Sequence, residues 1–96
     1  MNVIIKSRRE GKTLELIKRC AEEGGYIVCE SYKDADLIKE KATSMGLNIP
    51  LPITYNEFIQ GRYYGKGISG FHIDNADIFI QHMSKAVEVK SITITK

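Results

Sequence analysis

Short apolar runs alternate along this chain with segments whose apolar residues recur at helical spacing. Val3–Ile5 predicts a buried strand, and in Thr13–Glu23 the apolar residues share one broad side of a helix. Gly24 and Gly25 then predict the end of that helix. Strands separated by helices form parallel sheets with right-handed crossovers. We therefore expect an α/β fold of three layers, with a small, mostly parallel sheet flanked by helices.

The same alternation continues to the end of the sequence. Ser31 predicts a helix start and Gly46 predicts its end. A strand within Leu51–Tyr55 is expected to be marginal or to begin after Pro52, because proline cannot donate to a sheet ladder. Gly61–Gly70 contains four glycines and predicts a mobile loop. The other predicted elements are strands at Tyr26–Cys29, Phe71–Asp74 and Ile92–Thr95, and helices at Ala35–Met45, at Glu57–Gln60 after an Asn56 cap, and at Ala76–Ser84 after an Asn75 cap.

The composition fits one small domain that covers residues 1–96. Of these residues, 43% are hydrophobic and 27% are charged. The apolar runs are too short to span a membrane, and the N-terminus lacks the charged-then-apolar order of a signal peptide. We therefore expect a cytoplasmic protein without a membrane segment, in which Cys20 and Cys29 are buried, reduced thiols. The formal net charge of +2 does not by itself indicate a nucleic-acid partner.

The segment KSRREGKT, Lys6–Thr13, lies between the first predicted strand and the first predicted helix. A phosphate-binding loop needs a tight turn of backbone amides, a lysine and a hydroxyl at a helix start. In that arrangement Lys12 would reach the phosphate oxygens and Thr13 would bind Mg²⁺. The alternative is an exposed basic turn that precedes the helix. The predicted nucleotide-binding residues are Ser7, Arg8, Arg9, Glu10, Gly11, Lys12 and Thr13.

Asp74 closes the apolar strand that begins at Phe71. Ligands of parallel α/β sheets bind beyond the carboxyl ends of the strands, where Asp74 and the phosphate loop both fall. We expect the Asp74 carboxylate to lie near Thr13 and to bind Mg²⁺ through water. The alternative is an aspartate that only caps the following helix.

Together these motifs resemble the RecA-like group of P-loop NTPases. Ser7–Thr13 is similar to the variant Walker A loop of phage large terminases, in which arginines and a missing first glycine are common. Tyr26–Leu47 resembles the strand and helix after that loop, and Ile53–Tyr55 resembles a later strand end. Asp74–Asp77 is similar to the Asp-Glu-Ala-Asp box, and Ile92–Thr95 resembles the sensor strand. The order covers nearly the whole chain and looks like an abridged first motor domain of terminases and superfamily 2 helicases. It is also similar to short P-loop proteins of bacteriophages and prophages.

The resemblance implies a P-loop NTPase-like core that binds ATP and Mg²⁺, with Thr95 as a sensor residue. It also implies a sheet with Val3–Ile5 in a central position. The implied order from edge to edge is Tyr26–Cys29, Phe71–Ile73, Val3–Ile5 and Ile92–Thr95.

Two departures from this family pattern concern catalysis. Asn75 stands where these ATPases place a glutamate that activates water, and an asparagine can orient water but cannot accept its proton. Glu30 follows Tyr26–Cys29, in the place of the catalytic glutamate of the RecA branch; the alternative is a surface residue that is favourable near a helix start. The sequence also ends at the sensor strand, so we expect no second motor domain and no self-sufficient translocase.

Two basic segments predict contacts with phosphate or nucleic acid. Arg8 and Arg9 are expected to neutralise charge on the γ-phosphate, to contact nucleic acid, or to stay solvated. A second segment combines basic and aromatic side chains, which predicts base stacking with phosphate contacts. The alternative is a loop whose tyrosines fold back on the domain. The residues of this second segment are Arg62, Tyr63, Tyr64 and Lys66.

Three functional hypotheses follow. The first is a small P-loop protein that binds ATP·Mg²⁺ with slow or absent hydrolysis. The second is a pseudo-ATPase module that binds a phage, host or replication protein without nucleotide. The third is an accessory domain that binds DNA or another nucleic acid. An oligomer is compatible with all three.

Overall fold

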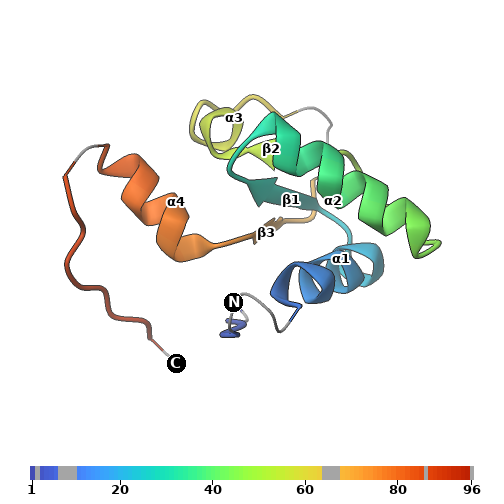
Figure 1. The fold of residues 1–96 in the computed structure, drawn as a ribbon, viewed down its shortest axis with the longest axis horizontal. Helices are drawn as coiled ribbons and strands as arrows, with labels where there is room; N and C mark the ends of the chain where they lie inside the picture. The colour runs from blue at the N-terminus through green and yellow to red at the C-terminus, as the bar shows by residue number, and fades with distance from the viewer. Residues whose placement is uncertain (2, 7–10, 64–67, 86, 96) are drawn as a thin grey trace.

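The computed structural model describes residues 1, 3–6, 11–63, 68–85 and 87–95. Within these residues, helices and strands alternate, as the sequence predicts (Figure 1). The elements are α1 (Lys12–Glu23), β1 (Tyr26–Cys29), α2 (Tyr32–Ser44), β2 (Ile53–Thr54), α3 (Tyr55–Ile59), β3 (Phe71–Ile73) and α4 (Ala76–Met83). The fold is thus a small α/β fold with a parallel sheet flanked by helices.

The sheet has three strands in the order β2-β1-β3, and both pairings are parallel. Val28 in the central strand is level with Ile53 of β2 and with Ile73 of β3. The carboxyl ends of the three strands therefore meet at one edge. The residues that directly follow the strands at this edge are Glu30, Tyr55 and Asp74.

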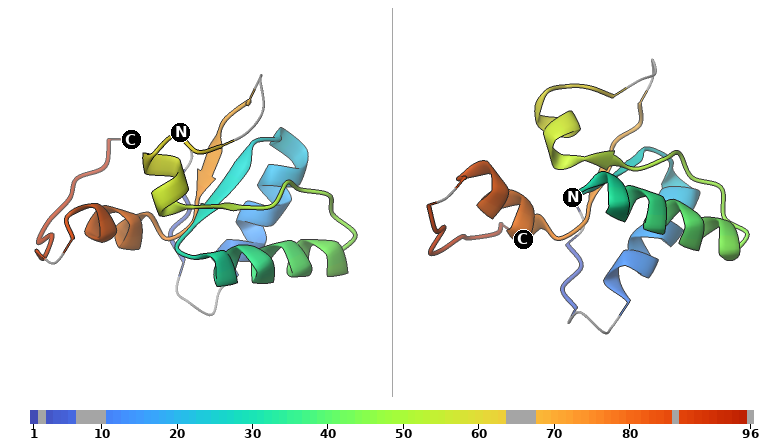
Figure 2. Two further views of the ribbon diagram at one scale, coloured as in Figure 1. Left: turned by 90° about the horizontal axis from the view of Figure 1, so that it is seen from above. Right: turned by 45° about the horizontal axis from the view of Figure 1, so that its top comes forward.

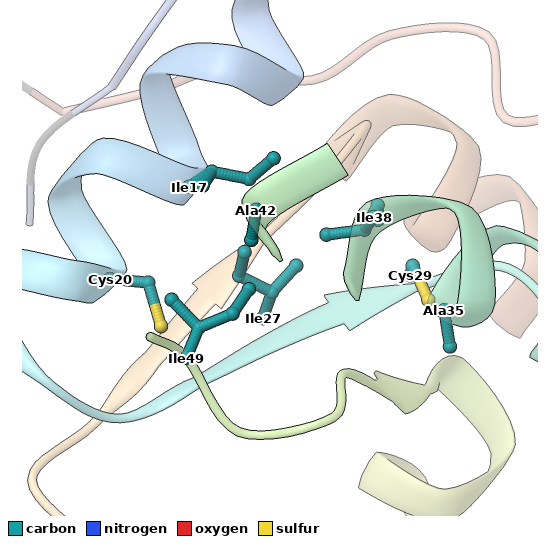
Figure 3. Packing of buried hydrophobic residues seen from close by; sticks show 8 residues of the cluster. All are labelled: Ile17, Cys20, Ile27, Cys29, Ala35, Ile38, Ala42 and Ile49. Atoms are coloured by element: carbon teal, nitrogen blue, oxygen red, sulfur yellow. The ribbon is translucent and has the colours of Figure 1, made fainter. Parts of the chain in front are cut away.

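Alternation along β1 divides the core into two clusters, one on each face of the sheet. Ile27 and Cys29 face α1 and α2, where they pack with Ile17 and Ile38 (Figure 3). Val28 points to the other face and packs in a cluster of mostly aromatic residues from β2, α3, β3 and α4. Figure 2 shows the helices on both sides of the strands, with α4 beyond the carboxyl end of β3. The sheet is therefore the middle of three layers.

The helix boundaries follow from local capping. Ser31 caps α2, as predicted, because its side chain accepts a hydrogen bond from the Asp34 amide at 3.2 Å. The predicted Asn56 cap for the next helix is wrong. Thr54 and Glu57 form a reciprocal capping box instead, so α3 begins at Tyr55.

Two predicted strands are absent from the sheet. Val3–Ile5 and Ile92–Thr95 lie outside any strand, so the prediction of Val3–Ile5 as a central strand is wrong. The parallel pairing of Tyr26–Cys29 with Phe71–Ile73 is confirmed, but the implied position of Tyr26–Cys29 at an edge is wrong, because this strand pairs on both sides and is the centre of the sheet. A short segment gains little from its apolar residues unless they are covered, and Ile5 is 85% exposed while Ile92 is 51% exposed. In the described part of the chain, β3 pairs with β1 alone, and its second edge has no strand partner.

Candidate functional site

The N-terminus of α1 presents Gly11, Lys12 and Thr13 in succession. Gly11 is the N-cap in a left-handed conformation (φ 74°, ψ 36°) and makes no side-chain cap. The first intrahelical bond runs from the Glu15 amide to the Gly11 carbonyl at 3.0 Å. The amides of the first turn before Glu15 thus have no partner within the helix, and the helix dipole favours an anion in front of them. Ser7, Arg8, Arg9 and Glu10, which were predicted to complete the loop, lie outside the described residues.

Asp74 lies directly after β3, at the carboxyl edge of the sheet. Its amide donates to the Val28 carbonyl of β1 at 2.9 Å, which extends the ladder by one residue. Its side chain is buried, and the Thr13 hydroxyl donates to Oδ2 at 3.2 Å, with Oδ1 at 3.5 Å. The structure therefore brings together the two residues that were predicted to bind magnesium, although 61 positions separate them in the sequence.

Burial raises the pKa of the Asp74 carboxyl above its ordinary value, and Asp34 acts in the same direction. The hydrogen bond from Thr13, the charge of Lys12 and the Asn75 amide oppose this shift. The net pKa is raised because burial outweighs these three effects. The surroundings of the ionised carboxylate therefore do not fully compensate its charge. A cation at this carboxylate would be favoured by the same electrostatics.

A hydroxyl and a carboxylate are hard oxygen donors of the type that Mg²⁺ binds. Magnesium commonly takes only one or two protein ligands and keeps water and phosphate oxygens for the rest. Among the described residues, no three His, Cys, Asp or Glu side chains form a metal-binding group. Thr13 and Asp74 are thus two ligands of the type that a magnesium–phosphate complex uses.

Asn75 adopts a left-handed conformation (φ 55°, ψ 61°) at the N-cap position of α4. Asn75 thus occupies the predicted N-cap position, but its side chain does not form the cap hydrogen bond. Asparagine tolerates this backbone conformation better than most residues, including glutamate. This preference gives a conformational reason for asparagine at this position.

Glu30, the other predicted catalytic residue, is exposed at the end of β1. It shares the carboxyl edge with Asp74. Burial is the main cause that raises the pKa of the Tyr55 hydroxyl, and the charges of Asp74 and Glu30 act in the same direction. No hydrogen bond joins Glu30 to Asp74 or Asn75 among the described contacts. Its role as a base stays a prediction.

The predicted nucleic-acid segment is described only in part. The Tyr63 ring packs edge-on against Phe71 at 5.0 Å and stacks near Phe58 at 6.4 Å, so it folds back on the domain. Arg62 is exposed, while Tyr64 and Lys66 lie outside the described residues. Thr95, the predicted sensor residue, is exposed and outside any strand. Neither segment adds a described residue to the Thr13–Asp74 site.

Tyr55 is a residue of this site that the sequence analysis missed. It is 1% exposed, and its hydroxyl donates to the Asp74 carbonyl at 2.7 Å and lies 3.2 Å from the Asn75 carbonyl. The sequence signal for it was weak, since Tyr55 follows a strand of only two residues. Cys20 and Cys29 are free and buried, as predicted, and burial raises the pKa of the Cys29 thiol to about 12.

Comparisons with protein families, with curated proteins and with solved structures found no match to this chain. Among the described residues, no helix has the length and apolar character needed to cross a membrane.

Proposed function

We propose that this protein binds a nucleoside triphosphate, with ATP as the first candidate, together with Mg²⁺. The observation that carries the proposal is the 3.2 Å hydrogen bond between the Thr13 hydroxyl and the buried Asp74 carboxylate. It joins a helix N-terminus that favours anions to a carboxylate that favours a cation. A metal–triphosphate complex supplies both charges in one ligand.

Each residue has a distinct role in this proposal. The first-turn amides of α1 and the Lys12 ammonium bind phosphate oxygens. The Thr13 hydroxyl and the Asp74 carboxylate hold Mg²⁺, which neutralises phosphate charge when it is bound. The Thr13–Asp74 hydrogen bond keeps the two metal ligands close together before the ligand arrives.

The proposed hydrolysis is slow or absent. Asn75 cannot accept a proton from water, and its left-handed backbone disfavours a glutamate in its place. Glu30 is the remaining candidate base, and its exposed side chain is not bonded toward Asp74 in the described contacts. The proposed activity is therefore nucleotide binding with at most weak ATPase turnover.

A pseudo-ATPase interaction module is the second candidate function. It is favoured by the open edge of β3 and by the exposed apolar side chains of Val3, Ile5, Ile92 and Ile94. An open sheet edge can add a strand from a partner chain. This function requires no nucleotide, so ligand-dependent stability separates the two candidates.

The test compares thermal unfolding of the wild type and Lys12→Ala with ATP, GTP or ADP, each with and without Mg²⁺. A ligand that binds the folded state raises the melting temperature. We expect a shift with ATP·Mg²⁺ that Lys12→Ala largely removes, because a charge-assisted phosphate contact corresponds to about 10–100-fold in affinity. Lys18→Ala, an exposed lysine on the same helix, is the matched control. Equal shifts in the wild type and Lys12→Ala would contradict the phosphate-binding assignment.

A further inference from the structure

Tyr55 connects two strands that are not neighbours in the sheet. It follows β2, whereas the carbonyl groups that its hydroxyl contacts belong to the turn after β3, and β1 lies between these strands. The contact therefore spans the carboxyl edge of the whole sheet. This is the edge at which Thr13 and Asp74 meet.

The ring of Tyr55 is fixed from several sides. It packs against Phe79 of α4 with ring centroids 4.9 Å apart and meets the edge of His82 at 5.7 Å. A tyrosine hydroxyl has an ordinary pKa of about 10 and is therefore a hydrogen-bond donor at physiological pH. Tyr55 therefore presents a fixed donor to the turn.

The Asp74 backbone is held on both sides of the residue. Its amide donates to Val28 at 2.9 Å, and its carbonyl accepts from Tyr55 at 2.7 Å. The Asn75 carbonyl also accepts from the Phe79 amide at 3.0 Å, whereas the Asp74 carbonyl has no other described donor. Loss of the Tyr55 hydroxyl would leave the Asp74 carbonyl without its partner in a buried setting.

We propose that Tyr55 is a positioning residue for the metal site. Its hydroxyl holds the β3–α4 turn so that the Asp74 carboxylate faces the Thr13 hydroxyl. The claim that Tyr55 supports ligand binding rests on the proposed function. The claim that Tyr55 orients Asp74 concerns the ligand-free protein. The two claims are tested separately.

The first test uses amide NMR spectra of the ligand-free protein. Tyr55→Phe removes only the hydroxyl and keeps the ring against Phe79. Tyr63→Phe is the matched control, because Tyr63 packs in the same aromatic cluster but against Phe71, at the opposite end of β3. We expect Tyr55→Phe to shift the Thr13 and Asp74 resonances more than Tyr63→Phe does. Unchanged Thr13 and Asp74 resonances in folded Tyr55→Phe would overturn the inference.

The second test measures the affinity for ATP with Mg²⁺ and with EDTA. Tyr55→Phe should weaken binding about three- to tenfold in Mg²⁺, the range of one net hydrogen bond, and much less in EDTA. Equal losses in both conditions, or no loss, would contradict positioning of a metal ligand. If the wild type binds no nucleotide, the proposed function is wrong, and the NMR comparison alone decides whether Tyr55 positions Asp74.

Discussion

The Asp74 carboxyl is buried, and the described side chain that donates to it is the neutral hydroxyl of Thr13. Burial raises its pKa, so the folded protein binds the Asp74 proton more tightly than the unfolded chain does. The stability associated with the protonated carboxyl is present below the ordinary pKa of 3.8 and is lost as the pH rises through the raised folded value. At neutral pH the ionised carboxylate therefore lowers the stability of the ligand-free fold.

Replacement of Asp74 with asparagine should thus stabilise the ligand-free protein at pH 7. Asparagine keeps an acceptor for the Thr13 hydroxyl without the charge. The gain should shrink as the pH falls through the raised folded pKa and vanish well below pH 3.8, where the wild-type carboxyl is protonated in both states. Chemical denaturation across this pH range measures the effect, and the exposed Asp77→Asn is the matched control. A loss of stability at pH 7 would show that the ionised carboxylate is compensated within the fold.

The sequence predicted that Thr13 and Asp74 lie close together, and their hydrogen bond agrees with that proximity. The strand-end rule accounts for Asp74, which follows β3, but not for Thr13, because Val3–Ile5 does not form a strand. Tyr55 did not follow from that rule, because its contact crosses β1 and depends on where β2 is placed. Asn75 was predicted to cap α4 through its side chain, but its left-handed backbone depends on the β3–α4 turn, which local sequence does not specify.

At the scale of elements, local signals predicted α1, β1, α2, β3 and α4 with boundaries close to those observed. Their periodicity and caps are encoded within a few neighbouring residues, as the Ser31 cap illustrates. The start of α3 was placed too late because Asn56 was preferred as the cap, although Thr54 and Glu57 carry the capping-box spacing. The spacing of Thr54 and Glu57 thus specifies the observed start of α3.

The junction before β1 depends on close contact between two loops. Gly25 has φ 88°, and a Cβ atom there would lie against the Gly70 backbone, closer than nonbonded atoms allow. The Tyr26 amide donates to the Gly70 carbonyl at 3.1 Å, so this contact also begins the β1–β3 pairing. The contact between Gly25 and Gly70 therefore sets where β1 and β3 begin to pair.

Gly25→Ala should lower the free energy of unfolding by about 2–4 kcal/mol, from backbone strain together with the steric clash. Gly46→Ala separates the two causes, because Gly46 has a similar φ of 72° but no atom within 4 Å of the added Cβ. The control should lose only about 1 kcal/mol from strain. Denaturant unfolding measures both variants. Equal losses would mean that the Gly25–Gly70 approach is looser in solution.

For the whole molecule, the observed sheet differs from the expected one at the open edge of β3. The resemblance implied that Val3–Ile5 and Ile92–Thr95 extend the sheet beyond β3, whereas the structure leaves both segments outside it. Apolar alternation indicates that a segment is able to form a strand, but pairing also depends on long-range contacts that a single sequence does not display. Pairing with neighbouring strands therefore explains why the strand prediction is correct for β1 and wrong for the two terminal segments.

The contribution of the C-terminal segment to stability can be measured directly. Ile92 and Ile94 are 51% and 53% exposed, so replacing both with serine should change the free energy of unfolding by no more than about 1 kcal/mol, or about 0.5 kcal/mol for each. Ile17→Ala is the contrasting variant, because Ile17 is fully buried between α1 and the sheet and its truncation should lose about 2–5 kcal/mol. A loss in the double serine variant that approaches that of Ile17→Ala would mean that this segment packs against the domain in solution. The open edge of β3 would then be the first place to look for it, because a segment that pairs there gains backbone hydrogen bonds and cover for its apolar side chains.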